Sequence, residues 1–381
     1  MSGQIIQFGT SRFLQAHVAF FAHEARESGQ HVGPITVVQT SGSAERAGRV
    51  DAFGTPYTVI LRGSENGQAV ERRTTVRSIA GGLAASRDWA ALVALFAGDA
   101  EFVVSNTGDR GYEVAAEDRS AALLEGGVPR SFPGKLTALL WERWRRGGRP
   151  LTILPCELIP RNAAVLHGLV RELADAAGAP DGFRDWLDTL VIWADTLVDR
   201  IVSEPLDPIG AVAEPYALWA IEARPGLVLP FTHPAVVVTE ALEPFERLKL
   251  HILNLGHTVL ADLWLRDRRP EGETVRAILN DDAVREELLR LYRDEVLPGF
   301  ARHGMGEDAE RYVATTMDRF RNPFLDHRLA DIAGNHAAKV ERRLGAFRDW
   351  VATAPGAPLP MPGIEAVIAR QTAPELVGGA A

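Results

Sequence analysis

An apolar run at residues 249–257, KLHILNLGH, contains a lysine, an asparagine and two histidines. Unpaired polar groups are costly in a protein core, so these residues need an explanation. Lys249 could take the proton of a substrate hydroxyl as a general base, which requires a side chain with a pKa near the working pH. The pKa of a lysine falls into that range when its amine is desolvated or lies beside another positive charge. Asn254 can donate to a developing alkoxide, and His257 can bond to the same oxygen.

Each of these residues also has a structural interpretation. A lysine can extend its ammonium group to water, an asparagine can bond to nearby backbone, and a buried histidine can be a core residue. On an ideal α-helix Lys249, Asn254 and His257 would fall at about 0°, 140° and 80°, so they would share one side. His251, at about 200°, lies off that side and is predicted to be structural.

Three other polar positions are candidates for a site. Asn162 follows a predicted strand at its carboxyl end, where ligands gather, but it is equally suited to cap a helix over 163–176. Asp199 precedes Arg200, and the two could form either a buried ion pair or part of a site. Lys339 could bind a substrate carboxylate or hydroxyl, or it could lie on a solvated helix face.

The segment QFGTSRFLQAH runs from a strand through Gly9 into a predicted helix, which presents free backbone N–H groups to a phosphate. The usual dinucleotide fingerprint has three glycines, whereas Ser11 stands where the second would fall. The acidic residue expected after the second strand is missing from VVQTSGSAERAGR. Arg46 or Arg49 could bind a 2′-phosphate, so NAD and NADP are both candidate cofactors.

Strands and helices alternate in the N-terminal part of the chain. Strands are predicted at 5–8, 35–39, 101–106 and 151–155, and helices at about 11–27, 88–98 and 134–144. This alternation predicts crossover units and a parallel sheet. The segments TVIL and ERRTTVRSI flank the turn signal SENG and predict a hairpin insertion.

From DWLDTLVIWADTLVDRI onward, most segments have apolar residues at three- and four-residue spacing, which predicts helices. The helical candidates after a strand-like segment at 236–240 are 244–266, 273–296, 307–320 and 327–351. The predicted fold class is therefore α/β. A Rossmann-type dinucleotide-binding domain is expected over 1–205, with ligands at the carboxyl ends of its strands. A mainly helical substrate and catalytic domain is expected over 206–381.

Composition excludes several classes of function. The formal net charge of -9 argues against nucleic acid as a partner. A single cysteine, Cys156, allows no internal disulfide and indicates a reducing compartment. The chain has neither a signal-peptide pattern nor the roughly 18 apolar residues of a membrane span, so a cytoplasmic location without membrane contact is expected. Histidine, cysteine and acidic residues do not occur at the usual zinc spacings, so no metal is expected.

Seven blocks resemble one known family: QFGTSRFLQAH, FVVSNTGDRG, SFPGKLTALLWERW, LPCELIPRN, TLVDRIV, KLHILNLGHT and RFRNPFLDHRLADIAGNHAAK. In the same order, from residue 4 to about 345, they are similar to the mannitol dehydrogenase family, the polyol-specific long-chain dehydrogenases. Within it they are most similar to the tagaturonate reductases, also called altronate oxidoreductases. The resemblance implies metal-independent hydride transfer between NAD(H) and a sugar carbon.

The resemblance also implies roles for individual residues. The K-x4-N-x2-H spacing implies an acid/base role for Lys249 and roles at the reacting oxygen for Asn254 and His257, and CELIPRN adds Asn162 to the catalytic set. The implied cofactor-binding residues are Gly9, Ser11, Arg12, Phe13, Asn106 and Thr107. The implied substrate-binding residues are Asp199 and Lys339.

The leading hypothesis is an NAD(H)-dependent oxidoreductase acting on a sugar acid of the tagaturonate or altronate type. A dehydrogenase of an uncharged hexitol or pentitol is an alternative, because the chain is shorter than tagaturonate reductases around 205–235 and 265–310. A catalytically silent dinucleotide-binding sensor is a third hypothesis, although a sensor has no need of an acid/base residue.

Overall fold

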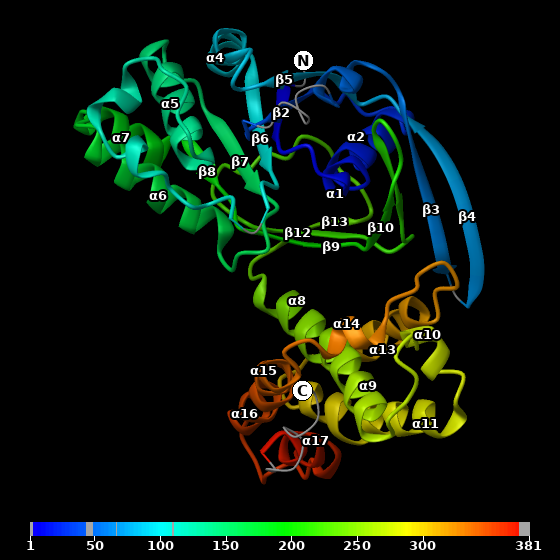
Figure 1. Ribbon diagram of the computed structural model, residues 1–381. Coiled ribbons are helices and arrows are strands. Elements are labelled where there is room, and N and C mark those ends of the chain that lie inside the picture. The colour runs from blue at the N-terminus through cyan, green and yellow to red at the C-terminus, as the bar shows by residue number, and fades with distance from the viewer. Residues whose placement is uncertain (1–2, 43–48, 66, 109, 373–381) are drawn as a thin grey trace, which may run out of the picture. The chain divides into compact units, whose positions relative to one another are not determined.

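A computed structural model describes residues 3–42, 49–65, 67–108 and 110–372 (Figure 1). Contacts between residues divide the chain into two compact units. Unit 1 comprises Met1–Leu61 and Glu71–Leu242, and unit 2 comprises Arg62–Val70 and Glu243–Ala381. The chain passes between the units at three points, the last of them after Leu242. The domain boundary expected at 205/206 remains a prediction.

The centre of unit 1 is a parallel sheet. Within the described ranges it has six strands in the order β5-β2-β1-β6-β7-β8, and all its neighbouring pairs are parallel. The strands are β1 (Gln4–Phe8), β2 (Ile35–Gln39), β5 (Ile79–Ala84), β6 (Ala100–Ser105), β7 (Leu151–Pro155) and β8 (Val191–Trp193). The strand order reverses between β1 and β6, which is the switch point where doubly wound folds bind ligands. The predicted Rossmann-type class is confirmed.

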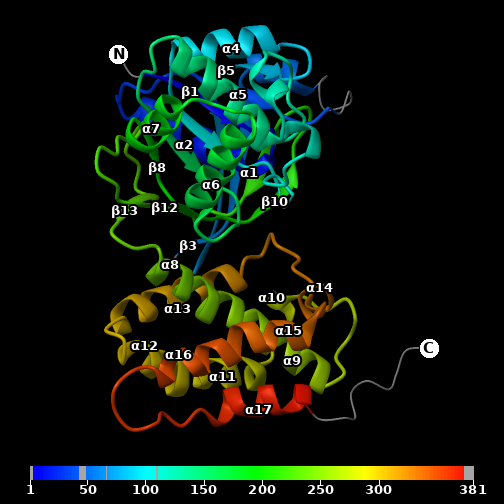
Figure 2. The same cartoon turned by 90° about the vertical axis from the view of Figure 1, so that its left-hand side faces the viewer.

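Helices cover both faces of this sheet, because successive strand residues point to opposite faces. Ile5 on one face packs in a cluster with α2 (Val18–Glu27). Ile6 on the other packs with α4 (Trp89–Gly98) and α5 (Phe132–Arg145). Figures 1 and 2 show α5, α6 (Asn162–Ala176) and α7 (Asp181–Thr189) grouped on this second side.

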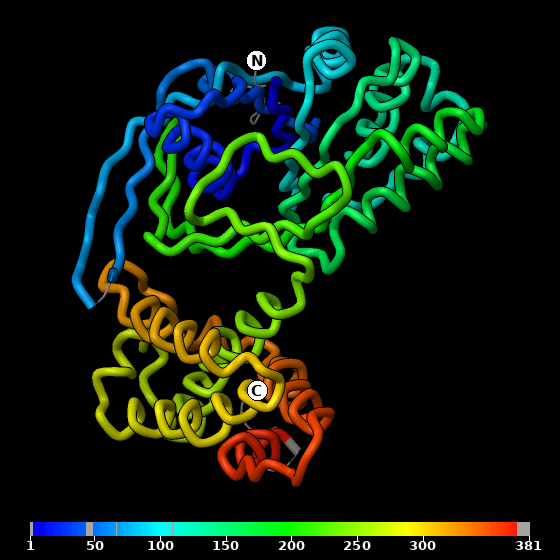
Figure 3. Tube along the Cα trace, turned by 180° about the vertical axis from the view of Figure 1, so that it is seen from behind, coloured from blue at the N-terminus to red at the C-terminus, as the bar shows by residue number. Residues whose placement is uncertain are grey.

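Two smaller sheets have most of their strands in unit 1, although Arg62–Val70 at the end of one hairpin belongs to unit 2. The predicted hairpin is confirmed as β3 (Tyr57–Glu65) and β4 (Gln68–Val76), which Figure 3 traces as two long adjacent lengths. It continues into β11 (Gly210–Ala213) and β10 (Val202–Pro205), giving a sheet of four strands in the described chain. In the other sheet β12 (Leu218–Glu222) lies between β9 (Thr196–Asp199) and β13 (Val236–Thr239). These pairings bind the segment up to residue 239 to unit 1.

Two predictions of helix were wrong. The helix expected over 11–27 is two helices, α1 (Arg12–Gln15) and α2, separated at His17, whose ring bonds to the carbonyl of Leu218 at 3.0 Å. The helical pattern read from 185 onward ends after α7, and the chain then forms β8, β9 and β10. The partners β7, β12 and β11 lie elsewhere in the sequence, so tertiary pairing overrides the local pattern.

Unit 2 is helical, with α9 at its centre in contact with α10, α11, α14 and α15. Figure 2 shows these helices in layers, with α17 at one edge. The helices are α8 (Glu243–Leu248), α9 (Leu255–Arg266), α10 (Val275–Ile278), α11 (Asp282–Leu291), α12 (Leu297–Ala301), α13 (Gly306–Phe320), α14 (Leu329–Ala333), α15 (His336–Val340), α16 (Ala346–Ala352) and α17 (Pro362–Thr372). In the described residues, no helix is long and apolar enough to span a bilayer.

Three of the predicted helical stretches contain π-helical turns. They are η4 (Lys249–Asn254), η5 (Tyr292–Val296) and η6 (Glu341–Gly345), three such turns in the part of the chain described. The stretch expected at 307–320 is confirmed as α13. Hydrophobic spacing predicts that a segment is helical, but it does not reveal where a helix widens.

His17 makes the stability of unit 1 depend on pH. Burial lowers the pKa of this fully buried ring to about 3, and the hydrogen bond with Leu218 only partly opposes that effect. An unfolded histidine has a pKa near 6.5, so the unfolded state binds the proton first as pH falls. The free energy of unfolding should therefore decrease below pH about 6.5, by up to about 1.4 kcal/mol per pH unit.

Urea unfolding of the wild type and of His17→Gln between pH 7.5 and 5 tests this prediction. Glutamine retains a donor for the Leu218 carbonyl but does not titrate. The free energy of unfolding of the variant should fall less steeply with decreasing pH. Equal slopes for the two proteins would show that another group causes the acid sensitivity.

Candidate active site

The KLHILN segment forms a π turn instead of the α-helix that its sequence predicts. In η4 the N–H of Leu255 donates to the carbonyl of Leu250, five residues earlier. Such turns are rare and frequently occur at functional sites. In a π turn residues five apart lie closer together around the helix axis than the roughly 140° of an ideal α-helix, so Lys249 and Asn254 are expected on the same side. The α-helical separation therefore does not apply to this segment.

Asn254 presents an amide that is free to bind a ligand. Its main-chain oxygen accepts from the Thr258 hydroxyl at 2.9 Å and from Nη1 of Arg343 at 3.2 Å. Its side chain is half-buried and makes no hydrogen bond within the described residues. The backbone is thus held while the amide stays available.

His257 follows in the first turn of α9 and is 8% exposed. Its ring lies 4.5 Å from the ring of Phe320 and 4.9 Å from that of His327, measured between centroids. Burial lowers its pKa well below the usual value, and the nearby His327, Arg319 and Arg343 lower it further. His257 is therefore neutral near pH 7 and can donate or accept a hydrogen bond.

Basic side chains surround these residues. Lys339 donates to the carbonyl of Ile332 at 2.6 Å, and its pKa is lowered by burial and then by Arg343. Arg343 also contributes to the lowered pKa of His257. The sequence argument missed Arg319, which is only 5% exposed. A buried arginine is unusual, but its sequence neighbours RFRNP do not reveal that it is buried.

The first turn of unit 1 is built on a close backbone contact. Gly9 has φ 109°, and a Cβ at this position would lie 2.3 Å from the carbonyl oxygen of Asn106. The N–H of Asn106 donates to the oxygen of Phe8 at 2.9 Å. These bonds join the carboxyl ends of β1 and β6 at the switch point. A glycine is therefore required there for a structural reason as well.

The predicted cofactor residues after Gly9 have structural contacts of their own. Ser11 accepts from the N–H of Leu14 and caps α1, which is only four residues long. Arg12 donates to the carbonyl of Gly210 and pairs with Asp207 at 3.2 Å. Phe13 stacks on His17 with centroids 4.6 Å apart. Their predicted role in binding the cofactor remains a prediction.

A buried carboxylate that the sequence argument missed holds the loop after β6. Glu157 accepts from the Ser105 hydroxyl at 2.9 Å, from the Thr107 N–H and hydroxyl at 3.0 Å each, and from the Tyr112 hydroxyl at 3.2 Å. Burial raises its pKa, which these hydrogen bonds partly oppose. The amide of Asn106 donates to the Cys156 carbonyl at 2.7 Å. An acidic residue directly after a predicted strand was the available signal.

A cavity of about 450 Å³ opens at the same edge of the sheet. Its lining includes Thr40 and Ser41 after β2, Thr107 after β6, and Ser131. Together with the close backbone approach at Gly9, this cavity fits a dinucleotide at the switch point. Arg46, a candidate for binding a 2′-phosphate, lies outside the described residues.

Asn162 has little capacity left for a substrate. Its Nδ2 lies within hydrogen-bond distance of the carbonyls of Pro155, Glu157 and Thr196 at 3.1, 3.1 and 3.0 Å. Its Oδ1 accepts from the N–H groups of Thr196 and Ala163 at 3.0 and 2.9 Å. The amide thus links β7, α6 and β9. This geometry favours a structural role over the predicted catalytic one.

Asp195, rather than Asn162, supports the start of α6 from outside the helix, because its carboxylate accepts from the N–H groups of Ala163 and Ala164 at 2.8 and 2.9 Å.

Asp199 is 5% exposed at the end of β9. The neighbouring Arg200 donates to the carbonyls of Glu214 and Ala16 at 3.0 and 2.6 Å. The proposed substrate role of Asp199 remains a prediction.

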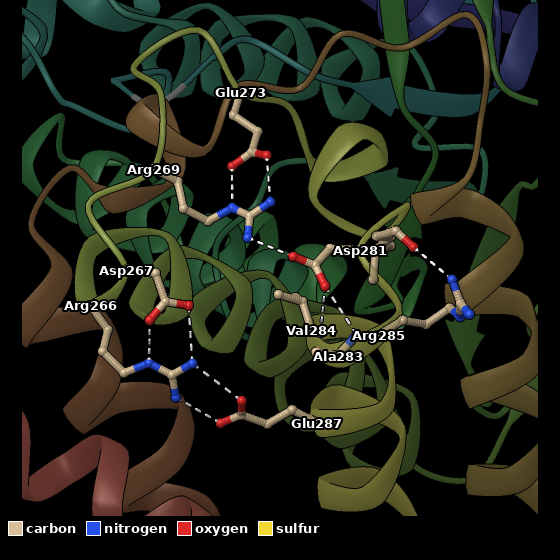
Figure 4. Close-up of polar contacts among 10 residues, drawn as sticks. Arg266, Asp267, Arg269, Glu273, Asp281, Ala283, Val284, Arg285 and Glu287 are labelled. Carbon is tan, nitrogen blue, oxygen red and sulfur yellow. Dashed lines mark hydrogen bonds and ion pairs between the residues drawn. The ribbon is translucent and has the colours of Figure 1, made fainter.

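Ion pairs hold the connection between α9 and α11 (Figure 4). Arg269 bonds with both oxygens of Glu273 and reaches Asp281, the N-cap of α11. Arg266 bonds with Glu287 at 2.9 and 3.3 Å. Single exposed pairs contribute little, but a network with paired geometry contributes more. This part of the 265–310 region, where the chain was expected to be short, is thus a well-connected turn.

No group of three or more histidine, cysteine, aspartate or glutamate side chains within the described residues could hold a metal ion. The buried Cys156 has a raised pKa because of burial, so its thiol is protonated near pH 7.

Comparison with known proteins gives two family matches. Residues 3–227 match the mannitol dehydrogenase Rossmann domain, and residues 241–347 match the mannitol dehydrogenase C-terminal domain. The chain is 30% identical to the altronate oxidoreductase of Halalkalibacterium halodurans, over 93% of this chain and 72% of that protein. It is also 30% identical to that of Bacillus subtilis, over 89% and 73%.

Two solved structures share the fold. A D-sorbitol dehydrogenase in substrate-free form has a TM-score of 0.76 at 20% identity, covering 91% of this chain and 75% of that one. The Pseudomonas fluorescens mannitol 2-dehydrogenase, in a ternary complex with NAD and D-mannitol, has a TM-score of 0.68 at 20% identity, covering 98% and 85%.

Substituting Gly9 should weaken cofactor binding more than backbone strain alone would. Gly9→Ala combines an unfavourable positive φ with an overlap against the Asn106 oxygen. Gly29→Ala is a matched control, because Gly29 has φ 88° but no atom within 4 Å of an added Cβ. Both variants carry a strain of about 1–2 kcal/mol.

The dissociation constant of NADH, measured by fluorescence titration, should rise at least about tenfold in Gly9→Ala and stay within about twofold in Gly29→Ala. A tenfold change is about 1.4 kcal/mol of binding free energy. Equal affinities in the two variants would remove Gly9 from the cofactor site.

Proposed function

The chain belongs to the mannitol dehydrogenase family, and from this premise we propose that it is an NAD(H)-dependent oxidoreductase that interconverts a secondary hydroxyl and a ketone on a sugar acid. The first substrate proposed is of the tagaturonate and altronate type, and two relatives are named altronate oxidoreductases. The observation that supports the proposal is the π turn η4, in which Lys249 and Asn254 are expected to lie on one side of the helix.

The use of lysine in this chain supports an acid/base role for Lys249. There are three lysines, Lys135, Lys249 and Lys339, among 41 basic residues, so arginine occupies nearly all other cationic positions. Arginine keeps its proton in proteins, whereas a lysine can release it. Lysine at 249 therefore provides what arginine cannot, a proton that can be given and taken back.

Each residue then has one task at the reacting oxygen. Nζ of Lys249 takes the hydroxyl proton during oxidation and returns it to the carbonyl oxygen during reduction. The free amide of Asn254 donates to that oxygen as negative charge develops on it. The neutral ring of His257 adds a hydrogen bond without adding charge. The nicotinamide, when bound, supplies or receives the hydride.

Unit 1 supplies the proposed cofactor site. Backbone at Gly9 and the loop at Asn106 and Thr107 would hold the dinucleotide at the switch point, next to the cavity lined by Ser41. NAD is proposed as the cofactor because the family chemistry uses it. Burial lowers the pKa of Arg12, and the positive charge of Arg49 lowers it further. Arg49 therefore places positive charge near the turn that follows β1. Comparison of NADH with NADPH decides the preference.

The charge around His257 supports an anionic substrate. Arg319, Arg343 and His327 each contribute to lowering its pKa, after burial. Burial lowers the pKa of His327, and Lys339 lowers it further, so this ring is neutral near pH 7. The positive groups of Arg319, Arg343 and Lys339 attract a carboxylate, and guanidinium groups bind one in paired geometry. An uncharged polyol would gain nothing from this arrangement, which makes a polyol dehydrogenase the second candidate.

Removal of the Lys249 amine should abolish turnover while the cofactor still binds. In Lys249→Met we expect kcat to fall by about 10²–10⁴-fold, the usual contribution of a general acid or base. NADH should bind with unchanged affinity. Arg311→Met on α13 is a control, since it removes an exposed cation of the same unit. Full turnover in Lys249→Met would disprove the acid/base assignment.

The charge of the substrate is decided by steady-state kinetics with a panel of hexuronates and hexitols. The value of kcat/KM should be higher for the hexuronate. In Lys339→Met it should fall about tenfold for the hexuronate, about 1.4 kcal/mol, and stay within about twofold for a hexitol. A hexitol preference in the wild type would instead favour the polyol dehydrogenase.

A further inference from the structure

The π turns of unit 2 contact one another. In each turn an N–H donates to a carbonyl five residues earlier: Leu255 to Leu250 in η4, Leu297 to Tyr292 in η5, and Ala346 to Glu341 in η6. Both η5 and η6 lie against η4. A widened turn changes the main-chain partners of its carbonyls, so side chains that donate to those carbonyls support it.

Tyr292, the first residue of η5, supplies one such donor. Its hydroxyl donates to the carbonyl of Ile252 in η4 at 2.8 Å. The side chain is 1% exposed, and burial raises the pKa of the phenol, so it remains a donor at neutral pH. The contact spans 40 positions of sequence. The phenol therefore links two widened turns, and we call this hydrogen bond from Tyr292 to the Ile252 carbonyl the strut.

Gly256 makes room for this strut. A Cβ on Gly256 would lie 1.9 Å from the Tyr292 hydroxyl and 3.1 Å from the ring of Phe320. Glycine is unfavourable inside a helix, yet this one is the second residue of α9, which begins at Leu255 directly after η4. The glycine in KLHILNLGH thus leaves the space that the phenol needs to reach the Ile252 carbonyl.

Arg343 of η6 supplies the second donor. Its Nη1 reaches the Asn254 carbonyl at 3.2 Å and the Thr258 hydroxyl at 2.9 Å. In the opposite direction, Nδ1 of His251 bonds with the carbonyl of Arg343 at 3.1 Å. Two bonds thus cross between η4 and η6, one from each side.

We propose that Tyr292 and Arg343 are positioning residues that hold η4 in its widened form and so set the directions of Lys249 and Asn254. If η4 narrowed to an α-helix, residues five apart would differ by about 140° around the axis, which is more than in the widened turn. The two functional side chains would then point to different sides. The inference rests on the function proposed for Lys249.

Tyr292→Phe tests the strut, because it removes the hydroxyl and keeps the ring. We expect kcat to fall about tenfold or more, the KM for NADH to stay within about twofold, and the pH at which kcat is half-maximal to shift. Thr137→Val is the matched control, since it removes a buried hydroxyl that donates to the Pro133 carbonyl at 2.8 Å in α5. It should leave both kcat and its pH profile unchanged.

A second readout does not depend on activity. With three lysines in the chain, reductive ¹³C-methylation gives few NMR signals, and Lys→Arg variants assign them. The Lys249 signal should titrate at a different pH in Tyr292→Phe than in the wild type, whereas Thr137→Val should leave it in place. An unchanged Lys249 titration together with an unchanged kcat profile would overturn the inference. If the wild type reduces none of the sugars tested, the proposed function fails, and the titration still decides the positioning role.

Gly256→Ala gives an independent test. The added methyl group should displace the phenol and lower kcat by at least tenfold. In the double variant Gly256→Ala/Tyr292→Phe the overlap with the hydroxyl is gone, so the melting temperature should recover relative to Gly256→Ala, while kcat stays low because the strut is absent. A double variant no more stable than Gly256→Ala, or one with wild-type kcat, would contradict the role of the strut.

Discussion

Main-chain hydrogen bonding in η4 is the constraint on which the geometry of unit 2 depends. The bond from Leu255 to Leu250 widens the helix where α8 passes into α9. Carbonyls of this turn accept from Tyr292 and Arg343, which come from two other helices. The polar residues of the apolar run are thus compatible with burial because the backbone around them is satisfied. The side chains of Lys249 and Asn254 lie at the surface of this bonded framework.

In unit 1, buried polar groups of the loops are bonded by side chains. At the carboxyl ends of β6 and β7, loops leave the sheet within a buried region and their polar groups need partners. Glu157 accepts from Ser105 and Thr107, and Asn162 bonds to backbone of three different segments. One carboxylate and one amide therefore fix the edge of the sheet at which a dinucleotide would bind. Fixed loops of this kind reduce the reorganisation that ligand binding requires.

Much of unit 1 could be predicted from the sequence because its strands are short apolar segments separated by helices. The segment after α7 could not, since β8 and β9 depend on partners far along the chain. The family assignment is confirmed, whereas the roles that the resemblance implies for Lys249, Asn254 and His257 remain predictions. The structural tasks of Asn162, Glu157 and Tyr292 could not be predicted, because each bonds with atoms 34 to 52 positions away. No local pattern encodes such distances.

A π turn is an α-helix that has accommodated an extra residue. The geometry of η4 therefore depends on how many residues it contains as much as on which residues they are. The loss of any one residue between Lys249 and Asn254 would let the segment close into a regular α-helix, with the lysine and the asparagine four positions apart and again on one side. A relative with a gap of one position here could therefore keep both residues together without the widened turn, whereas a relative in which they stand five positions apart needs it.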